Sequence, residues 1–168
     1  MREGLRSLVL GLCQTALNPK PKDLKTKDQR PMIIAIDGPA GSGKSTLGRM
    51  LARALNLLYI DTGSMYRAIA LATIEAALDP SNKDAVTELA QRADINLDGD
   101  PDSLRVWLEG RNVTERIRED DITEMSSVVS SIPGVRRAMV TRQRELGKRG
   151  GVMDGRDNGT VVFSGCSF

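Results

Sequence analysis

Residues 32–46 read MIIAIDGPAGSGKST, and this stretch decides the fold. The apolar run 32–36 is typical of a strand buried on both faces, and it ends at Asp37. Residues 38–45 match the G-x-x-x-x-G-K-[ST] pattern in full, and apolar residues at helical spacing follow as far as Leu55. A strand, a glycine-rich turn and a helix in this order predict a phosphate-binding loop in an α/β sheet.

The chemistry of this loop follows from its backbone and three side chains. The glycines let backbone N–H groups turn toward phosphate oxygens, and the helix N-terminus adds partial positive charge. Lys44 is placed to reach the β- and γ-phosphates, Ser45 to offer its hydroxyl to Mg²⁺, and Thr46 to contact a more distal phosphate oxygen. The residues expected to bind a nucleoside triphosphate are Gly38, Pro39, Ala40, Gly41, Ser42, Gly43, Lys44, Ser45 and Thr46.

The loop alone does not name the acceptor, but the sequence narrows the class. A GTPase needs a guanine-reading N-K-x-D, and the nearest string, residues 82–85, reads NKDA and lacks the final Asp. A motor or a helicase needs a longer chain with further strands. Small-molecule kinases are therefore the class that this sequence favours.

Composition sets further limits. The chain of 168 residues has room for one domain, and 40% apolar with 27% charged residues argue against a disordered or fibrous protein. The absence of His excludes His-based triads, general bases and metal ligands. Cys13 and Cys166 lie at opposite ends and give neither a zinc spacing nor a disulfide framework, so we expect a cytoplasmic protein.

Residues 1–31 are predicted to be a flexible basic leader in front of a domain that covers 32–168. The leader holds seven Lys/Arg against three Asp/Glu, which leaves 17 against 19 in the rest of the chain. This slightly acidic body and the low aromatic content of 3% argue against nucleic acid as a partner. Apolar residues at helical spacing in 5–17 are too few to span a bilayer, so no membrane partner is expected. An unstructured start, a targeting segment and a partner-docking helix stay open for the leader.

The rest of the chain alternates short apolar runs with helical segments, which predicts an α/β sheet with short parallel strands. A second short strand covers 57–60 and a third covers 152–153, so good candidates for the sheet are few. Turn residues between short alternating runs predict a small antiparallel insert that starts near residue 94. Helices are expected over 64–78, 82–93, 120–131 and, after Pro133 at a first turn, to about 147.

Two polar motifs, DTGSMYR at 61–67 and DGRDNGT at 154–160, each follow a predicted strand. Because the carboxyl ends of parallel strands meet in one crevice, both motifs should face the same ligand. Arg67 is suited to a bidentate phosphate contact. A capping turn with a surface Arg, and a surface ion pair between Arg156 and Asp157, are the structural alternatives.

Taken together, these motifs resemble those of bacterial cytidylate kinases, over residues 32–163. The resemblance rests on I-D-G-P-A-G-S-G-K-S-T, D-T-G-S-M-Y-R, L-E-G-R-x-V-T around 108–114, S-x-V-S-x-I-P-x-V-R at 127–136, Q-R at 143–144 and D-G-R-D-x-G-T-V-V-F at 154–163. It implies a three-layer P-loop fold with a nucleoside-monophosphate-binding insert at about 94–130 and a mobile lid. It also implies transfer of the γ-phosphoryl group of ATP to CMP or dCMP, with Mg²⁺, by a monomer.

The resemblance also assigns the acceptor site. Cytosine offers an N4 amino donor to Asp157, and its N3 and O2 accept from Arg136 and Ser127, whereas uracil places a carbonyl against the carboxylate. The residues implied for the CMP phosphate are Thr62, Tyr66, Arg67 and Arg156, those for the base are Ser127, Arg136 and Asp157, and those for catalysis are Lys44, Arg67 and Arg156.

The chain departs from the family pattern at three places. Asn158 stands where an apolar residue is usual, Ser164 replaces a Pro, and the sequence ends at Phe168. The resemblance implies further core strands, an arginine-bearing lid and a final helix beyond this point, so we expect little turnover and an exposed, aggregation-prone edge at residues 32–36. A non-catalytic nucleotide-binding fragment or pseudoenzyme, and a kinase for another small acceptor such as UMP or shikimate, are the alternative functions.

Overall fold

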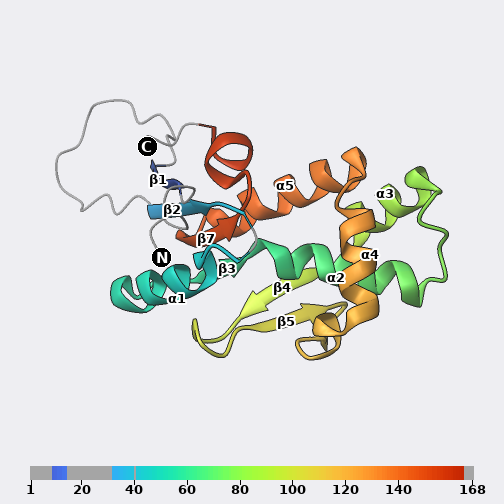
Figure 1. Cartoon of the computed structure of the whole chain (residues 1–168), viewed down its shortest axis with the longest axis horizontal. Coiled ribbons are helices and arrows are strands. Elements are labelled where there is room, and N and C mark those ends of the chain that lie inside the picture. Colours follow the sequence, from blue (N-terminus) through green and yellow to red (C-terminus); the bar gives the residue numbers. More distant parts are fainter. Residues whose placement is uncertain (1–8, 15–31, 40, 165–168) are drawn as a thin grey trace, which may run out of the picture.

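The structure is a computed structural model, and it describes residues 9–14, 32–39 and 41–164. Four strands form the main sheet: β1 (Val9–Gln14), β2 (Met32–Asp37), β3 (Tyr59–Asp61) and β7 (Gly151–Gly155). Their order in space is β1-β2-β7-β3 (Figure 1). β2, β7 and β3 run parallel, whereas β1 runs antiparallel to β2. The expected α/β fold with a parallel sheet at its centre is confirmed.

Helices flank this sheet, and local signals in the sequence set their ends. Asp61 accepts a hydrogen bond from the Ser64 N–H, Asn82 caps the next helix in the same way, and Pro133 occupies a first turn. No helix in the described ranges is both long enough and apolar enough to cross a membrane. The helices are α1 (Lys44–Leu55), α2 (Thr62–Glu75), α3 (Lys83–Arg92), α4 (Asp120–Val129) and α5 (Pro133–Gly147), with a 3₁₀ turn at Arg116–Arg118 and a π-helical turn, η3, at Asn158–Val162. The helices that the sequence predicts are confirmed, with ends that differ by a few residues.

β2 is buried along both faces, as its continuous apolar run predicts. Ile34 and Ile36 point to one face, where they pack in a cluster with residues of α1. Ile33 points to the other face and joins the larger cluster formed with α2 and α5. The sheet is therefore the middle layer of three.

A second, antiparallel sheet consists of β4 (Ile95–Asp98), β5 (Arg105–Leu108) and β6 (Arg111–Asn112). Side chains alternate between buried and exposed along β4 and β5, and the buried ones join the larger core next to α2. The antiparallel insert expected from residue 94 onward is confirmed.

One prediction for the leader is wrong. The helical spacing read in 5–17 does not produce a helix at Val9–Gln14, because these residues form β1. β1 pairs with β2 from Val9↔Asp37 to Gln14↔Met32, so the β2 edge that was expected to be exposed is covered. Any extended segment can satisfy the free backbone groups of a strand edge, whatever its side-chain spacing. The remaining leader residues lie outside the described ranges, and its boundary at residue 31 stays a prediction.

Candidate active site

Three polar segments meet at one edge of the main sheet. The parallel strands are in register with Asp37 opposite Gly155 and Asp61 opposite Asp154, so they end at the same level. The phosphate loop follows β2, α2 follows β3, and the loop that begins the η3 turn follows β7. The two polar motifs therefore follow strand ends at the same edge of the sheet, as expected.

The phosphate loop has the conformation that its glycines allow. Gly41 and Gly43 have φ of 76° and 85°, which few other residues adopt at low cost. The Lys44 ammonium donates a hydrogen bond to the Pro39 carbonyl at 2.6 Å, and the Ser42 hydroxyl donates to the same oxygen at 2.9 Å. The lysine is therefore folded back over the loop at the start of α1. Ala40, also expected in this loop, lies outside the described residues.

Asp154 lies at the centre of this edge, although the sequence motifs indicate no role for its side chain. Its Oδ2 accepts hydrogen bonds from Ser45 Oγ at 2.7 Å and from the Tyr59 hydroxyl at 3.0 Å, and its backbone carbonyl accepts one from Thr62 Oγ1 at 2.7 Å. The side chain is only 3% exposed. Burial, and next the negative charge of Asp61, raise the pKa of the Asp154 carboxyl. The sequence does hold one signal for this role: Asp154 stands at the end of a predicted strand, as Asp37 and Asp61 do.

Ser45 and Asp154 together form a donor set that suits Mg²⁺. Mg²⁺ prefers oxygen ligands and is usually held by one or two carboxylates together with substrate phosphates and water. A P-loop hydroxyl and an Asp at the end of a neighbouring strand are the pair that P-loop nucleoside triphosphatases use for this ion. The two side chains that fit the ion thus come from residues 109 positions apart in the sequence.

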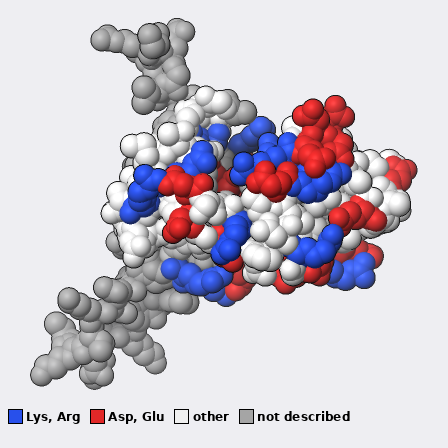
Figure 2. Space-filling view, turned by 90° about the horizontal axis from the view of Figure 1, so that it is seen from below, with Lys and Arg blue, Asp and Glu red and all other residues white. Residues whose placement is uncertain are grey.

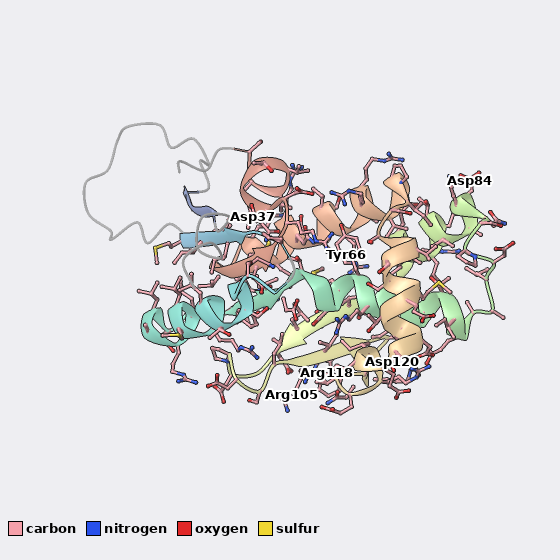
Figure 3. The ribbon with its side chains drawn as sticks, in the orientation of Figure 1. Asp37, Tyr66, Asp84, Arg105, Arg118 and Asp120 are labelled. Atoms are coloured by element: carbon pink, nitrogen blue, oxygen red, sulfur yellow. The ribbon has the colours of Figure 1, made fainter. Side chains whose placement is uncertain are left out.

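A second cluster contains three of the residues expected to bind the acceptor. Arg136 Nη2 lies 2.6 Å from Asp157 Oδ2, and both side chains are about half exposed. Tyr66 faces this pair: its pKa is raised mainly by burial, while Arg136 lowers it and Asp157 raises it. Figure 3 shows Tyr66 on α2, toward the side of α5. The structure therefore brings together side chains from α2, α5 and the loop after β7.

The remaining predicted residues differ in their surroundings. Arg67 is half-buried near the start of α2 and Arg156 is exposed, and within the described part of the chain neither forms an ion pair or a side-chain hydrogen bond. The Thr62 hydroxyl proton is committed to the Asp154 carbonyl. Ser127 Oγ donates to the Thr123 carbonyl of its own helix at 3.3 Å and makes no described contact with the Arg136–Asp157 pair. The two free guanidiniums are thus available for an anion, whereas Thr62 and Ser127 have local partners.

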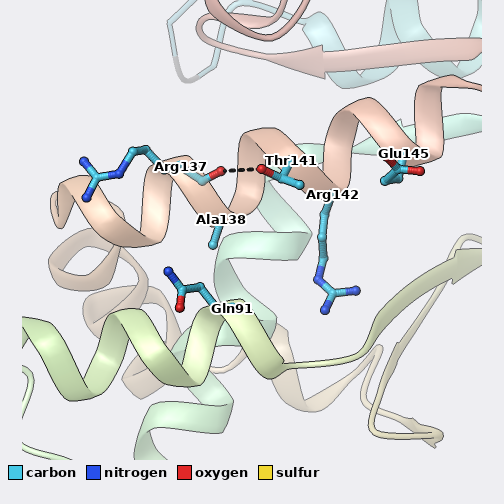
Figure 4. A pocket seen from close by; sticks show the side chains of 6 residues that line it. All are labelled: Gln91, Arg137, Ala138, Thr141, Arg142 and Glu145. Atoms are coloured by element: carbon cyan, nitrogen blue, oxygen red, sulfur yellow. Dashed lines mark hydrogen bonds between the residues drawn. The ribbon is translucent and has the colours of Figure 1, made fainter.

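Two cavities lie away from this edge. The larger, of about 360 Å³, lies between α3 and α5 (Figure 4). The other, of about 280 Å³, lies beside α2 and the small sheet. On the face seen in Figure 2, positive and negative side chains are interspersed, as on a solvated surface. The cavity of Figure 4 is lined by Gln91, Arg137, Ala138, Thr141, Arg142 and Glu145.

Comparisons with known proteins show which family the chain is similar to. A family model described as cytidylate kinase matches residues 34–168. The chain is 48% identical to a cytidylate kinase of Mycobacterium avium over 134 residues, which is 79% of this chain and 59% of that protein. A cytidylate kinase of Caldanaerobacter subterraneus is 47% identical over 136 residues, which is 80% of this chain and 59% of the relative. A bifunctional pantoate ligase/cytidylate kinase of a Synechococcus strain is 43% identical over 154 residues, which is 89% of this chain and 28% of the relative. The chain thus spans about 59% of the length of the cytidylate kinases that it matches.

Proposed function

The chain belongs to the cytidylate kinase family, and we propose that it binds ATP and CMP or dCMP and transfers the γ-phosphoryl group from the first to the second. The observation that carries the proposal is the convergence of three strand ends on one edge. There the phosphate loop and the Ser45–Asp154 contact lie next to the two segments that carry Arg67 and Arg156, whose guanidiniums have no described partner.

On the donor side, the loop N–H groups and Lys44 hold the ATP phosphates. Ser45 and Asp154 would hold Mg²⁺, which when bound would offset the negative charge of the ATP phosphates. The Tyr59 hydroxyl keeps the Asp154 carboxylate oriented, because it donates to the oxygen that also accepts from Ser45. Burial raises the pKa of Asp154 and so disfavours the carboxylate form that a metal site needs. The positive charge of a bound Mg²⁺ would favour that form.

On the acceptor side, Arg67 and Arg156 bind the phosphate of the monophosphate. A guanidinium presents a planar fork of donors that matches phosphate oxygens. Both residues follow strand ends adjacent to the phosphate loop, so the two phosphate groups approach each other between positive charges. Tyr66 lines the same side, next to the pair that reads the base.

The Arg136–Asp157 pair accounts for the choice of cytosine. The carboxylate is an acceptor for the N4 amino group, and the guanidinium beside it is a donor for N3 and O2. Ser127 supplies a second donor after rotation away from its helix carbonyl. Uracil offers a carbonyl where cytosine has the amino group, which leaves the carboxylate without a donor.

The reaction needs no covalent enzyme intermediate. An acceptor phosphate oxygen attacks the γ-phosphorus in line with the departing ADP oxygen, and the transferred group passes between the two. Lys44, Arg67 and Arg156 act by positioning the two phosphates and by balancing the negative charge that spreads over them.

The test is transfer of radiolabelled γ-phosphate from ATP to CMP, dCMP and UMP by the purified chain. We expect CDP to form only slowly, UMP to be an even poorer acceptor, and Lys44→Ala to abolish both transfer and ATP binding. Lys83→Ala, which removes an exposed lysine from the start of α3, is the matched control and should leave both unchanged. Binding of both nucleotides without transfer would indicate a nucleotide-binding protein, and equal use of CMP and UMP would contradict the assigned base pocket.

A further inference from the structure

The Asp37 carboxylate is buried, and both of its oxygens accept hydrogen bonds from backbone N–H groups of the segment after β7. It is 7% exposed, and it makes no ion pair with any residue that the structure describes. Its Oδ1 accepts a hydrogen bond from the Asn158 N–H and its Oδ2 accepts one from the Gly159 N–H, each at 2.8 Å. Burying a carboxylate is costly unless hydrogen bonds compensate it, so these two amides hold Asp37 in place and Asp37 holds them.

The other end of the same segment is held by a cation. Arg144 of α5 donates from Nε to the Val162 carbonyl at 2.8 Å and from Nη2 to the Val161 carbonyl at 3.0 Å. A helical turn exposes N–H groups at its start and carbonyls at its end, so a carboxylate and a guanidinium are the right partners for the two ends. The η3 turn is thus fixed to β2 at one end and to α5 at the other.

Arg156 and Asp157 lie directly before this fixed turn, and the backbone before them is fixed as well. The Gly155 carbonyl accepts a hydrogen bond from the Gly38 N–H at 3.3 Å. A Cβ on Gly155 would lie 2.5 Å from Thr62 Oγ1 and 2.6 Å from Asn158 Nδ2, so the chain passes here without room to shift. The two residues therefore form a short bridge between two anchored points.

We propose that Asp37 and Arg144 are positioning residues of the acceptor site, which they serve by holding the loop that carries Arg156 and Asp157. The inference rests on the proposed function, because it gives that loop the task of binding the monophosphate. Asp37 is also the residue directly before the phosphate loop. One side chain therefore sets the distance between the part of the chain that binds the donor phosphates and the part that binds the acceptor.

The test compares Asp37→Asn with the wild type by calorimetric titration of CMP, UMP and ATP. The substitution keeps the size of the side chain but turns one acceptor oxygen into an amide that faces a backbone N–H. We expect CMP affinity to fall roughly tenfold or more, the CMP/UMP preference to shrink, and ATP affinity to stay within about twofold, since the loop amides and Lys44 are untouched. Asp84→Asn is the control, because Asp84 is an exposed aspartate on α3, far from Asp37 in Figure 3.

A second variant and a second measurement separate positioning from general damage. Arg144→Met releases the other end of the turn without disturbing a buried charge, and it should reduce CMP affinity in the same direction. Amide hydrogen exchange of Asn158 and Gly159 should accelerate in Asp37→Asn, while the amides of β3 and α2 keep their rates.

The outcomes distinguish the two proposals. Loss of CMP preference in both variants, with ATP binding retained and faster exchange at the turn, supports positioning. Unchanged CMP affinity and unchanged exchange overturn it, and so does equal loss of CMP and ATP binding. A wild type that binds CMP and UMP alike contradicts the proposed function instead, and the exchange rates then still decide whether Asp37 holds the loop.

Discussion

Replacing Asp157 with Asn separates the stability of the fold from recognition of the base. The side chain pairs with Arg136 at 2.6 Å, and the two side chains are 45% and 47% exposed. An ion pair this exposed contributes about 0–1 kcal/mol to stability. In a chain of 168 residues, that loss lowers Tm by about 2–4 °C at most.

The same change should have a much larger effect on binding. A hydrogen bond to a charged partner contributes about 1.5–3 kcal/mol when its loss leaves a buried group unpaired. Because every 1.4 kcal/mol changes affinity tenfold, CMP affinity should fall roughly 10- to 100-fold. The affinity for UMP should rise, since the new amide offers an N–H to the uracil carbonyl. The ratio of CMP affinity to UMP affinity should therefore fall to about one or below it.

The assay is calorimetric titration of both nucleotides, with Tm measured on the same samples. Asp98→Asn is the matched control: Asp98 pairs with Arg105 at 2.8 Å, and both side chains are about half exposed, but the pair lies in the small antiparallel sheet. This control should match Asp157→Asn in Tm and match the wild type in nucleotide preference. An Asp157→Asn protein that keeps the CMP preference, or that loses far more stability than the control, would refute the reasoning.

Three further variants probe Asp154, its partner Tyr59 and the start of the loop that follows β7. Burial raises the pKa of Asp154 above its usual 3.8, so its ionised form costs stability once the pH exceeds that raised pKa. Asp154→Asn should therefore raise Tm at neutral pH, by a margin that shrinks as the pH falls toward 3.8, and it should abolish Mg²⁺-dependent ATP binding; a constant margin across pH would contradict this. Tyr59→Phe removes one donor to the Asp154 carboxylate, so the pKa should rise further and the pH midpoint of Mg²⁺-dependent binding should move upward, whereas an unmoved midpoint would show that Ser45 alone sets the carboxylate. Gly155→Ala places a methyl group 2.5 Å from Thr62 Oγ1, which should cost roughly 1–3 kcal/mol in urea unfolding, and a neutral result would mean that the loop is free to move.

Local patterns were enough to predict most of the fold. The buried strand, the phosphate loop and the helices at 62–75 and 133–147 follow from hydrophobic spacing and from Gly and Pro signals within a few residues of each element. β1 could not be predicted this way, because its pairing with β2 depends on a free strand edge and not on its own side-chain pattern.

The site was predictable where a motif lies beside a strand end, and less so where two distant segments meet. Tyr66, Arg136 and Asp157 come together as expected. The links from Asp37 to the Asn158 amide and from Ser45 to Asp154 span 121 and 109 residues, and they depend on the sheet register. A motif read along the chain treats these aspartates as strand ends, because their partners are set only when the strands align.

The antiparallel pairing of β1 with β2 also bears on how the chain should be handled. A shortened chain that starts at residue 32 would leave the edge of β2 that pairs with β1 open to solvent. A second molecule would then be the nearest source of a pairing strand, so self-association would grow with protein concentration. Residues Val9–Gln14 thus protect the edge of β2 from pairing with a second molecule.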